Sequence, residues 1–294
     1  MARSLSFFVV FASLSAACVV KAQVPTPAAI VADPPGDARH PARMEVLHIP
    51  SGDVAINGVA YLAAGAGPKP TLVLCHGWPG NEKNLDLAQA VRRAGWNAIT
   101  FNYRGSWGSP GSFRFAQVPE DARAVIAHLR DPARARALGV DPDRIVIAGH
   151  SMGGWASALV GGSDPRLMGT VLISAANMGR VAQTPRAELT RAAAENAETL
   201  ADTSPARMAD ELIADSAAFD FLQAAPGLAK RPLLVLTSND TLAAHTDALV
   251  AEVRKAGAAQ IAQAHVATDH SWSDRRIELQ ARVITWLQGL ETRR

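Results

Sequence analysis

Arg144-Ile-Val-Ile-Ala-Gly-His-Ser-Met-Gly-Gly-Trp155 is the stretch from which the fold can be worked out. Residues 145–148 are apolar without alternation, which is typical of a strand buried on both faces of a parallel sheet. Residues 149–153 then fit the pattern G-x-S-x-G, and a helix-compatible run follows at 155–160. Such a strand–turn–helix unit exposes its serine hydroxyl above the sheet, and its glycines leave room that a Cβ would fill. Ser151 is therefore a candidate nucleophile; the alternative is a structural turn with an idle hydroxyl.

Buried strands and amphipathic helices alternate on both sides of this unit. We expect strands at 71–75, 96–103, 169–175, 231–237 and 260–266, and helices at 82–94, 120–130, 241–256 and 274–290. Two earlier strands, 44–50 and 54–62, predict an antiparallel hairpin at a sheet edge, with turn signals at Ser51-Gly-Asp53 and Asn57-Gly58. The alternation predicts right-handed crossovers and a mostly parallel sheet, so the fold class is α/β, in one domain over residues 44–294.

Residues 178–228 interrupt this alternation. The segment is rich in Ala, Glu, Asp and Arg, has helical patterning around 187–200 and 205–218, and shows no pattern of a buried strand. About fifty residues are too many for an empty loop in a compact domain. We expect a helical cap insertion packed over the carboxyl edge of the sheet; the alternative is a solvated surface excursion.

The N-terminus has the pattern of a targeting segment. Arg3 precedes an apolar stretch over residues 5–20, and Val20-Lys21-Ala22 places small residues at positions −3 and −1 of a cleavage site. Residues 1–22 are therefore predicted to be a signal peptide, and the protein to be exported, either periplasmic or secreted. Lipoprotein anchoring at Cys18, within Ser15-Ala-Ala-Cys18, and an uncleaved membrane anchor are the alternatives. Residues 23–43, with five prolines, predict a flexible leader.

The composition narrows the class of protein. The 294 residues are 48% hydrophobic and 19% charged, as in an ordinary globular chain, with a net charge of +2. No basic cluster stands out, so no nucleic-acid partner is expected, and no integral membrane domain is predicted beyond the N-terminal segment. Past the signal peptide Cys75 is the only cysteine, which excludes an intramolecular disulfide. The sequence gives no indication of oligomeric state.

A serine hydroxyl needs a neighbouring base that is oriented by a third group. His270 follows the last predicted strand, at the carboxyl edge where Ser151 also lies, and is the expected base. Asp240 directly follows the strand before it and is the expected acid, which gives the chain order Ser, Asp, His. Asp269 and Asp274 are the competitors: the first adjoins the base and is poorly directed toward its ring, and the second fits a helix start.

Two backbone N–H groups are needed to bind the oxyanion. Met152, which follows the nucleophile, supplies one. The second should come from the loop His76-Gly-Trp-Pro-Gly80, which follows the 71–75 strand. Trp78 is the expected donor, because Gly77 lets the backbone turn closely and Pro79 has no N–H.

Four features resemble the serine-hydrolase branch of the α/β-hydrolase superfamily over residues 44–294: the His76-Gly77 loop, Gly149-His-Ser-Met-Gly153, Asp240 after a strand and His270 before the last helix. The loop Asn102–Ser112 also resembles one found in bacterial members with esterase or aminopeptidase-like activity. The resemblance implies an α/β-hydrolase fold with an eight-stranded, mainly parallel sheet flanked by helices. It also implies a Ser-Asp-His triad, a covalent acyl-enzyme, and no metal or organic cofactor. Trp78 departs mildly from the pattern, since it is bulky for an oxyanion position and would narrow the acyl pocket.

The expected function is hydrolysis of carboxylic esters by a serine hydrolase, on a small-molecule ester. Short peptides or amides are the alternative substrates, cleaved by an exported serine peptidase. An acyltransferase would use the same acyl-enzyme, with an alcohol or amine as acceptor in place of water. A non-catalytic binding protein fits least well, because all three triad candidates are present.

Overall fold

The computed structural model describes residues 25–257 and 260–292. The predicted signal peptide, including Cys18, and the first two residues of the predicted leader lie outside this part. Within it, no helix combines the length and the apolar character needed to cross a membrane.

Eight strands form one sheet in the order β1-β2-β4-β3-β5-β6-β7-β8. Their bounds are β1 Arg43–Ser51, β2 Val54–Leu62, β3 Lys69–Cys75, β4 Asn97–Phe101, β5 Val140–His150, β6 Gly169–Ile173, β7 Leu233–Thr237 and β8 Ile261–His265. β1 pairs antiparallel with β2, and β2 antiparallel with β4, whereas the remaining pairs are parallel. The predicted fold class, with its mainly parallel eight-stranded sheet, is confirmed.

The second predicted turn is wrong. Asn57 and Gly58 lie inside β2, where Gly58 pairs with Phe101 of β4. A Cβ on Gly58 would lie 3.0 Å from the Thr100 carbonyl oxygen, so glycine here permits a close approach of two strands. The hairpin turns instead at Gly52, which has a φ of 59°.

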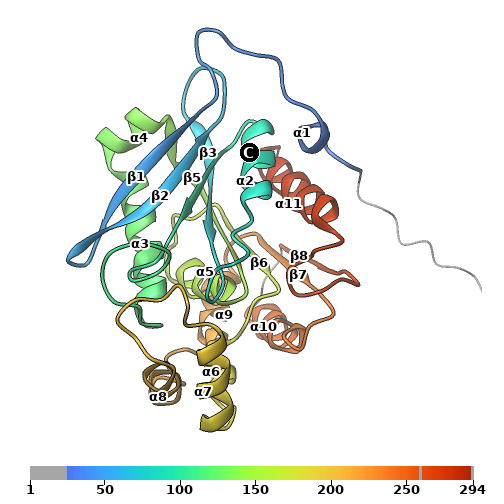
Figure 1. The fold of residues 1–294 in the computed structure, drawn as a ribbon. Coiled ribbons are helices and arrows are strands. Elements are labelled where there is room, and N and C mark those ends of the chain that lie inside the picture. Colours follow the sequence, from blue (N-terminus) through green and yellow to red (C-terminus); the bar gives the residue numbers. More distant parts are fainter. Residues whose placement is uncertain (1–24, 258–259, 293–294) are drawn as a thin grey trace, which may run out of the picture.

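Helices cover both faces of the sheet (Figure 1). One face carries α3 Gln117–Arg130, α5 Met152–Ser163, α9 Ala225–Leu228 and α10 Ala243–Lys255, and the other carries α2 Leu85–Arg93 and α11 Arg276–Glu291. α4 Pro132–Leu138 follows α3, and the short α1 Ala28–Val31 lies beside α2 and α11, within the segment predicted as the leader. The side chains of the two faces form two separate apolar clusters, so each face of the buried strands has its own core.

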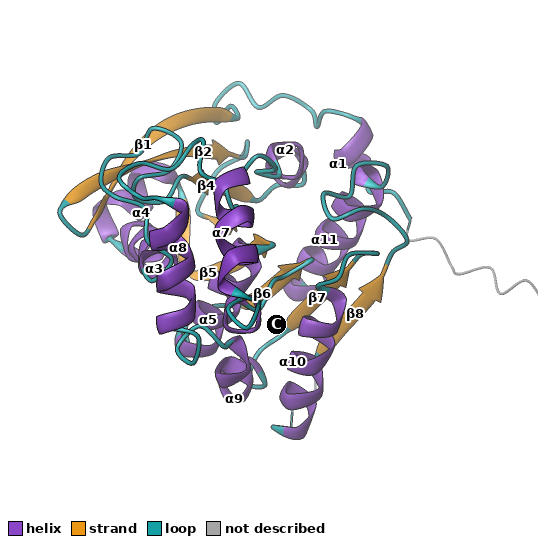
Figure 2. Ribbon diagram, turned by 60° about the horizontal axis from the view of Figure 1, so that its bottom comes forward, coloured by secondary structure: helices purple, strands orange, loops and turns teal. Residues whose placement is uncertain are grey.

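Segment 178–228 is helical. Its first part lies at the carboxyl end of the parallel strands, whereas its last part packs along α5 and α10 on one face of the sheet (Figure 2). The segment contains α6 Met178–Val181, α7 Arg186–Glu195, α8 Pro205–Ala214, the 3-10 helix η1 Phe221–Ala224 and α9. Figure 2, which brings the carboxyl end of the strands forward, shows α7 and α8 in front of the sheet. We call residues 178–228 the cap segment.

Backbone hydrogen bonds join the cap segment to the loop that follows β4. The Trp107 N–H donates to the Thr199 carbonyl at 3.0 Å, and the Phe113 N–H donates to the Ala201 carbonyl at 3.0 Å. The Ala201 N–H in turn donates to the Gly105 carbonyl at 2.7 Å. These bonds form a short ladder between segments about 90 residues apart, so the loop after β4 and the cap segment make one wall above the sheet.

Candidate active site

Ser151 occupies a sharp turn between β5 and α5, with φ 57° and ψ −121°. A non-glycine residue rarely adopts such a backbone conformation, and it persists only where surrounding contacts hold it. Those contacts are present: the Ser151 N–H donates to the Ile173 carbonyl at 3.0 Å, and its carbonyl accepts from the Ala176 N–H at 3.1 Å. The turn is therefore fixed to the end of β6.

The glycines on both sides of Ser151 are required by close backbone approach. A Cβ on Gly149 would lie 2.0 Å from the Gly153 carbonyl oxygen, and one on Gly153 would lie 2.1 Å from the Cys75 carbonyl oxygen. No side chain can be accommodated at such distances without moving backbone. The two glycines of the G-x-S-x-G pattern thus allow the first turn of α5 to pack directly on the backbone of β5 and β3.

The structure brings the predicted base and acid together. His270 lies between β8 and α11, and its Nδ1 is 2.7 Å from Oδ2 of Asp240, which follows β7. Burial alone would raise the pKa of the Asp240 carboxyl, but hydrogen bonds from His270, Ser238 and the Leu242 N–H outweigh it and lower that pKa below its usual value. Asp240 is therefore a carboxylate at neutral pH. Because a carboxylate can only accept, Nδ1 carries the proton and Nε2 is left as the basic nitrogen.

His150 connects the turn at Ser151 to the loop over residues 266–275, which carries the predicted base and which we call the base loop. Its Nε2 donates to the His270 carbonyl at 2.8 Å, and the two imidazole rings lie 4.6 Å apart. His270 is thereby held next to the residue that precedes Ser151. Within the described contacts the Ser151 hydroxyl makes no hydrogen bond, to His270 or to any other group.

The loop after β3, from which the second oxyanion donor was predicted, lies against the turn at Ser151. A Cβ on Gly77 would lie 3.1 Å from the Ser151 Cβ. Trp78 follows directly, and Met152 opens α5, where first-turn N–H groups have no helical acceptor. Among the described residues neither the Trp78 nor the Met152 N–H donates within the chain, so both remain available to an oxyanion. The Trp78 ring packs edge-to-face on Phe115 with centroids 5.2 Å apart.

His76 and Tyr103 hold the loop over residues 76–80 in place. The Tyr103 hydroxyl donates to the His76 carbonyl at 3.0 Å, and His76 Nδ1 lies 2.8 Å from the Gly77 carbonyl oxygen. Burial lowers the pKa of His76 to about 3 and that of His150 to about 4. Both imidazoles are consequently neutral at pH 7 and support the site through hydrogen bonds and ring packing rather than through charge.

These two buried imidazoles predict a loss of stability in mild acid. In the unfolded chain each takes up a proton near pH 6.5, whereas in the folded chain each resists protonation down to about pH 3 or 4. Their stabilising contribution is therefore complete above pH 6.5 and falls as the pH drops, by about 1.4 kcal/mol per pH unit for each ring. Urea unfolding at pH 7, 6, 5 and 4 measures the slope.

A matched pair of variants tests the origin of that slope. His150→Gln can keep a donor to the His270 carbonyl but does not titrate. It should lower the slope of the free energy of unfolding against pH by the share of one ring, about 1.4 kcal/mol per pH unit. His48→Asn removes an exposed histidine and should leave it unchanged. A free energy of unfolding that stays constant from pH 6.5 to 4.5 would contradict the assignment.

The competing carboxylates are occupied elsewhere. Asp269 accepts the Ser273 N–H at 2.8 Å, and Asp274 accepts the Thr268 hydroxyl at 2.5 Å. Within the described hydrogen bonds, neither one reaches the His270 ring. Of the carboxylates considered from the sequence, Asp240 is the one that contacts the His270 ring among the described hydrogen bonds.

Three polar residues near Asp240 were not expected from the sequence. The Ser238 hydroxyl donates to Asp240 Oδ2, the Ser174 hydroxyl lies against Ser238, and Trp272 Nε1 donates to Ser174. Ser238 and Trp272 each lie two residues from a triad candidate, which is a weak signal, whereas Ser174 becomes a neighbour only through the pairing of β6 with β7.

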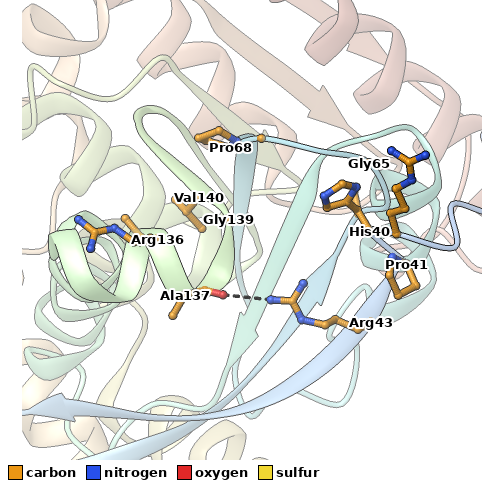
Figure 3. A pocket seen from close by; sticks show the side chains of 13 residues that line it. His40, Pro41, Arg43, Gly65, Pro68, Arg136, Ala137, Gly139 and Val140 are labelled. Atoms are coloured by element: carbon orange, nitrogen blue, oxygen red, sulfur yellow. Dashed lines mark hydrogen bonds between the residues drawn. The ribbon is translucent and has the colours of Figure 1, made fainter.

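Cavities lie at both ends of the sheet. One of about 540 Å³ lies between the loop after β3 and the base loop, and Lys83, Ser271 and Arg276 are among its lining residues. Another, of about 580 Å³, lies at the amino ends of β3 and β5 (Figure 3). Ser151 follows the opposite end of β5. At this second cavity Arg43 donates to the Ala137 carbonyl at 3.0 Å. No group of three or more potential metal-ligating side chains occurs among residues 25–257 and 260–292.

Solved structures with this fold include esterases and a peptidase. A thermostable carboxylesterase cloned from a metagenomic library matches with a TM-score of 0.62 and 24% identity, over 85% of this chain and 90% of that one. The Pyrobaculum calidifontis esterase matches at 0.63 and 18%, over 86% of each chain. The acylaminoacyl peptidase of Pyrococcus horikoshii matches at 0.62 and 15%, over 86% of this chain and 41% of that one. At these identities the likeness is one of fold.

The sequence is similar to part of one curated protein and matches one family model over most of its length. An uncharacterized protein of Mycobacterium tuberculosis is 29% identical over 114 residues, a match that spans 38% of this chain and 39% of the relative. The model of the Alpha/beta hydrolase family matches residues 72–283, from β3 into α11. Since that match covers well over half of the chain, the protein belongs to the alpha/beta hydrolase family.

Proposed function

We propose that this protein is a serine hydrolase that cleaves carboxylic esters through an acyl-enzyme intermediate. The observation that carries the proposal is the contact of 2.7 Å between the partly buried Asp240 carboxylate and His270, beside a strained turn that presents Ser151. Ser151, His270 and Asp240 follow the carboxyl ends of β5, β8 and β7, at the same end of the sheet. The family membership supports hydrolysis as the general chemistry.

The acylation step begins with Ser151 Oγ attacking the ester carbonyl carbon while His270 Nε2 takes the hydroxyl proton. The resulting oxyanion accepts hydrogen bonds from the Trp78 and Met152 N–H groups. The imidazolium is stabilised by the Asp240 carboxylate on its other nitrogen. When the tetrahedral intermediate collapses, the bond to the leaving oxygen breaks, His270 returns the proton to that oxygen, and the alcohol departs.

Water completes the cycle. His270 takes one proton of a water molecule as its oxygen attacks the acyl carbon, and the bond to Ser151 Oγ then breaks. The serine recovers its proton from His270, and the carboxylic acid leaves. If an alcohol or amine attacked the acyl-enzyme in place of water, the acyl group would pass to that acceptor and the protein would be an acyltransferase. With an amine as the leaving group, the same steps would cleave a short peptide or an amide.

A fluorophosphonate probe tests the proposal. We expect stoichiometric labelling, seen as an increase in intact mass, with the label mapped to Ser151 by peptide analysis. Ser151→Ala should not react, whereas Ser163→Ala, at the far end of the same helix, should react like the unchanged protein. Folded protein that fails to acquire the label at Ser151 would overturn the proposal.

The substrate class is separated by parallel assays. p-Nitrophenyl acyl esters should be turned over faster than aminoacyl p-nitroanilides, because an alcohol leaves more readily than an amine. An added alcohol that diverts the acyl group into a new ester at the expense of the free acid would identify acyl transfer. Faster turnover of the anilides would assign a peptidase instead.

A further inference from the structure

A buried chain of hydrogen bonds ends on the acid of the site. Trp272 Nε1 donates to Ser174 Oγ at 3.0 Å, Ser174 Oγ lies 2.7 Å from Ser238 Oγ, and Ser238 Oγ lies 2.9 Å from Asp240 Oδ2. Trp272 and Ser238 are 0% exposed and Ser174 is 1% exposed. The members come from three separate segments: the base loop, the end of β6 and the end of β7.

Only one assignment of the hydroxyl hydrogens gives every hydrogen bond from Trp272 to Asp240 one donor and one acceptor. The indole N–H can only donate and the carboxylate can only accept, while each hydroxyl has a single hydrogen. If Ser238 pointed its hydrogen at Ser174, two oxygens would face each other between Ser238 and Asp240 without a proton. Ser174 therefore donates to Ser238, and Ser238 donates to Asp240.

The backbone at two of these residues is held in an uncommon conformation. Ser174 has a φ of 42° and Trp272 a φ of 60°, both in the left-handed region that side chains disfavour. Ser174 is fixed there by its N–H, which donates to the Leu236 carbonyl at 2.8 Å. Strain of this kind is maintained only where neighbouring contacts require it, and it tends to lie at functional sites.

We propose that Ser238, Ser174 and Trp272 are positioning residues that fix the Asp240 carboxylate and set how strongly it holds the proton of the His270 imidazole. The proposal rests on the proposed function, in which His270 is the base. We name these three residues the Asp240 support chain.

The effect follows from the sharing of one oxygen. Oδ2 of Asp240 accepts both the His270 Nδ1 proton and the Ser238 hydroxyl. Each donor upstream polarises the next, so the Ser238 hydroxyl is a better donor than an isolated one. The hydrogen bond from Ser238 draws electron density from Oδ2, which makes this oxygen a weaker acceptor for the His270 Nδ1–H. Without the support chain, Asp240 would stabilise the imidazolium more strongly, and His270 would keep its proton to a higher pH.

Few other ionisable groups face His270. His150 lies against the ring but, with its pKa lowered to about 4 by burial, it stays neutral over the relevant range. On the α11 side, Arg276 is paired with Asp86 and donates to the Ser271 carbonyl. Asp269 adjoins the base in sequence, and Lys83 lines the neighbouring cavity. None of these charges changes when a member of the support chain is substituted.

The test compares the full-length protein with Ser238→Ala, Ser174→Ala and Trp272→Phe. In Ser238→Ala the titration midpoint of the His270 imidazole, followed by NMR, should rise by about 0.5–1 pH unit, and the acidic limb of kcat/KM should move with it. Ser174→Ala and Trp272→Phe act through Ser238, so their shifts should have the same direction and decrease with distance from Asp240.

Trp96→Phe is the matched control for Trp272→Phe. Both tryptophans are buried in the same apolar cluster, but Trp96 Nε1 has no hydrogen-bond partner, so this control should lose stability without moving either midpoint. An unchanged midpoint in Ser238→Ala, or equal shifts in the two tryptophan variants, would overturn the proposal. Because the NMR titration needs no turnover, it tests the support chain even where absent esterase activity shows that the proposed function has failed.

Discussion

Ser151→Ala protein should fold normally and lose p-nitrophenyl ester turnover by a factor on the order of 10⁴–10⁶. The hydroxyl makes no hydrogen bond within the described contacts, so its removal leaves no partner unpaired. The turn itself is held by backbone bonds to Ile173 and Ala176, which alanine keeps. The loss should therefore appear in kcat, with the melting temperature close to that of the unchanged protein.

Ser163→Ala provides the comparison for this variant. Its hydroxyl donates to the Leu159 carbonyl at 2.9 Å near the end of α5, remote from the turn. Turnover should be unchanged there. If Ser151→Ala kept turnover within tenfold of the unchanged protein, another nucleophile would have to be sought, and the acyl-enzyme proposed on Ser151 would be abandoned.

Asp240→Asn should lower kcat/KM by about 10³–10⁴-fold at pH 7. Asp240 accepts on both oxygens, from Leu242 N–H at Oδ1 and from His270 and Ser238 at Oδ2. An amide offers only one acceptor oxygen, so its NH₂ group must face either the Leu242 N–H or both His270 and Ser238. If the NH₂ group faces His270, the imidazole changes tautomer and Nε2 can no longer accept the serine proton. In either orientation the charge that stabilises the imidazolium is gone.

The kinetics of Asp240→Asn should be measured across pH, with fluorophosphonate labelling as a second measure of serine reactivity. Asp247→Asn in α10 is the control, because this carboxylate accepts only the exposed Gln263 amide among the described contacts. It should be fully active. Activity of Asp240→Asn within tenfold of the unchanged protein would remove Asp240 from the mechanism and return Asp269 to consideration.

The sequence predicted the parts of this molecule that depend on local pattern. Uninterrupted apolar runs identified the central strands, and in a parallel sheet the residues that follow such strands meet at one edge. That is why Asp240 and His270 could be placed next to each other, and Ser151 at the same end of the sheet, without coordinates. The strained turn at Ser151 was likewise expected, because the flanking glycines signal close backbone approach.

Element boundaries were less predictable where side chains act at a distance. The helix expected from residue 82 begins at Leu85, because Glu82 accepts the Asn84 N–H and Asn84 adopts a left-handed conformation. Arg276, almost 200 residues away, donates to Asn84 Oδ1. No local pattern carries such a contact.

α4 was missed although its capping residues are visible in the sequence. Asp131 accepts the Arg134 N–H, Pro132 is the first helical residue, and Gly139 ends the helix with a φ of 62°. Its seven residues are too few for a clear apolar period. The support chain was missed for a different reason: its order depends on strand neighbours, which the sequence order does not reveal.

The ladder between the cap segment and the loop after β4 bears on how this protein can be altered. Deleting residues 178–228 would leave the Trp107 and Phe113 N–H groups without the acceptors they have here, and the Trp155 indole without the Phe219 carbonyl 2.7 Å away. Deletion would open these groups to water, so each lost hydrogen bond costs its net contribution to stability, about 0.5–1.5 kcal/mol. Residues 178–228 are thus not a detachable module: a segment exchanged in from another family member has to supply backbone partners at the same places, or be moved together with residues 105–113.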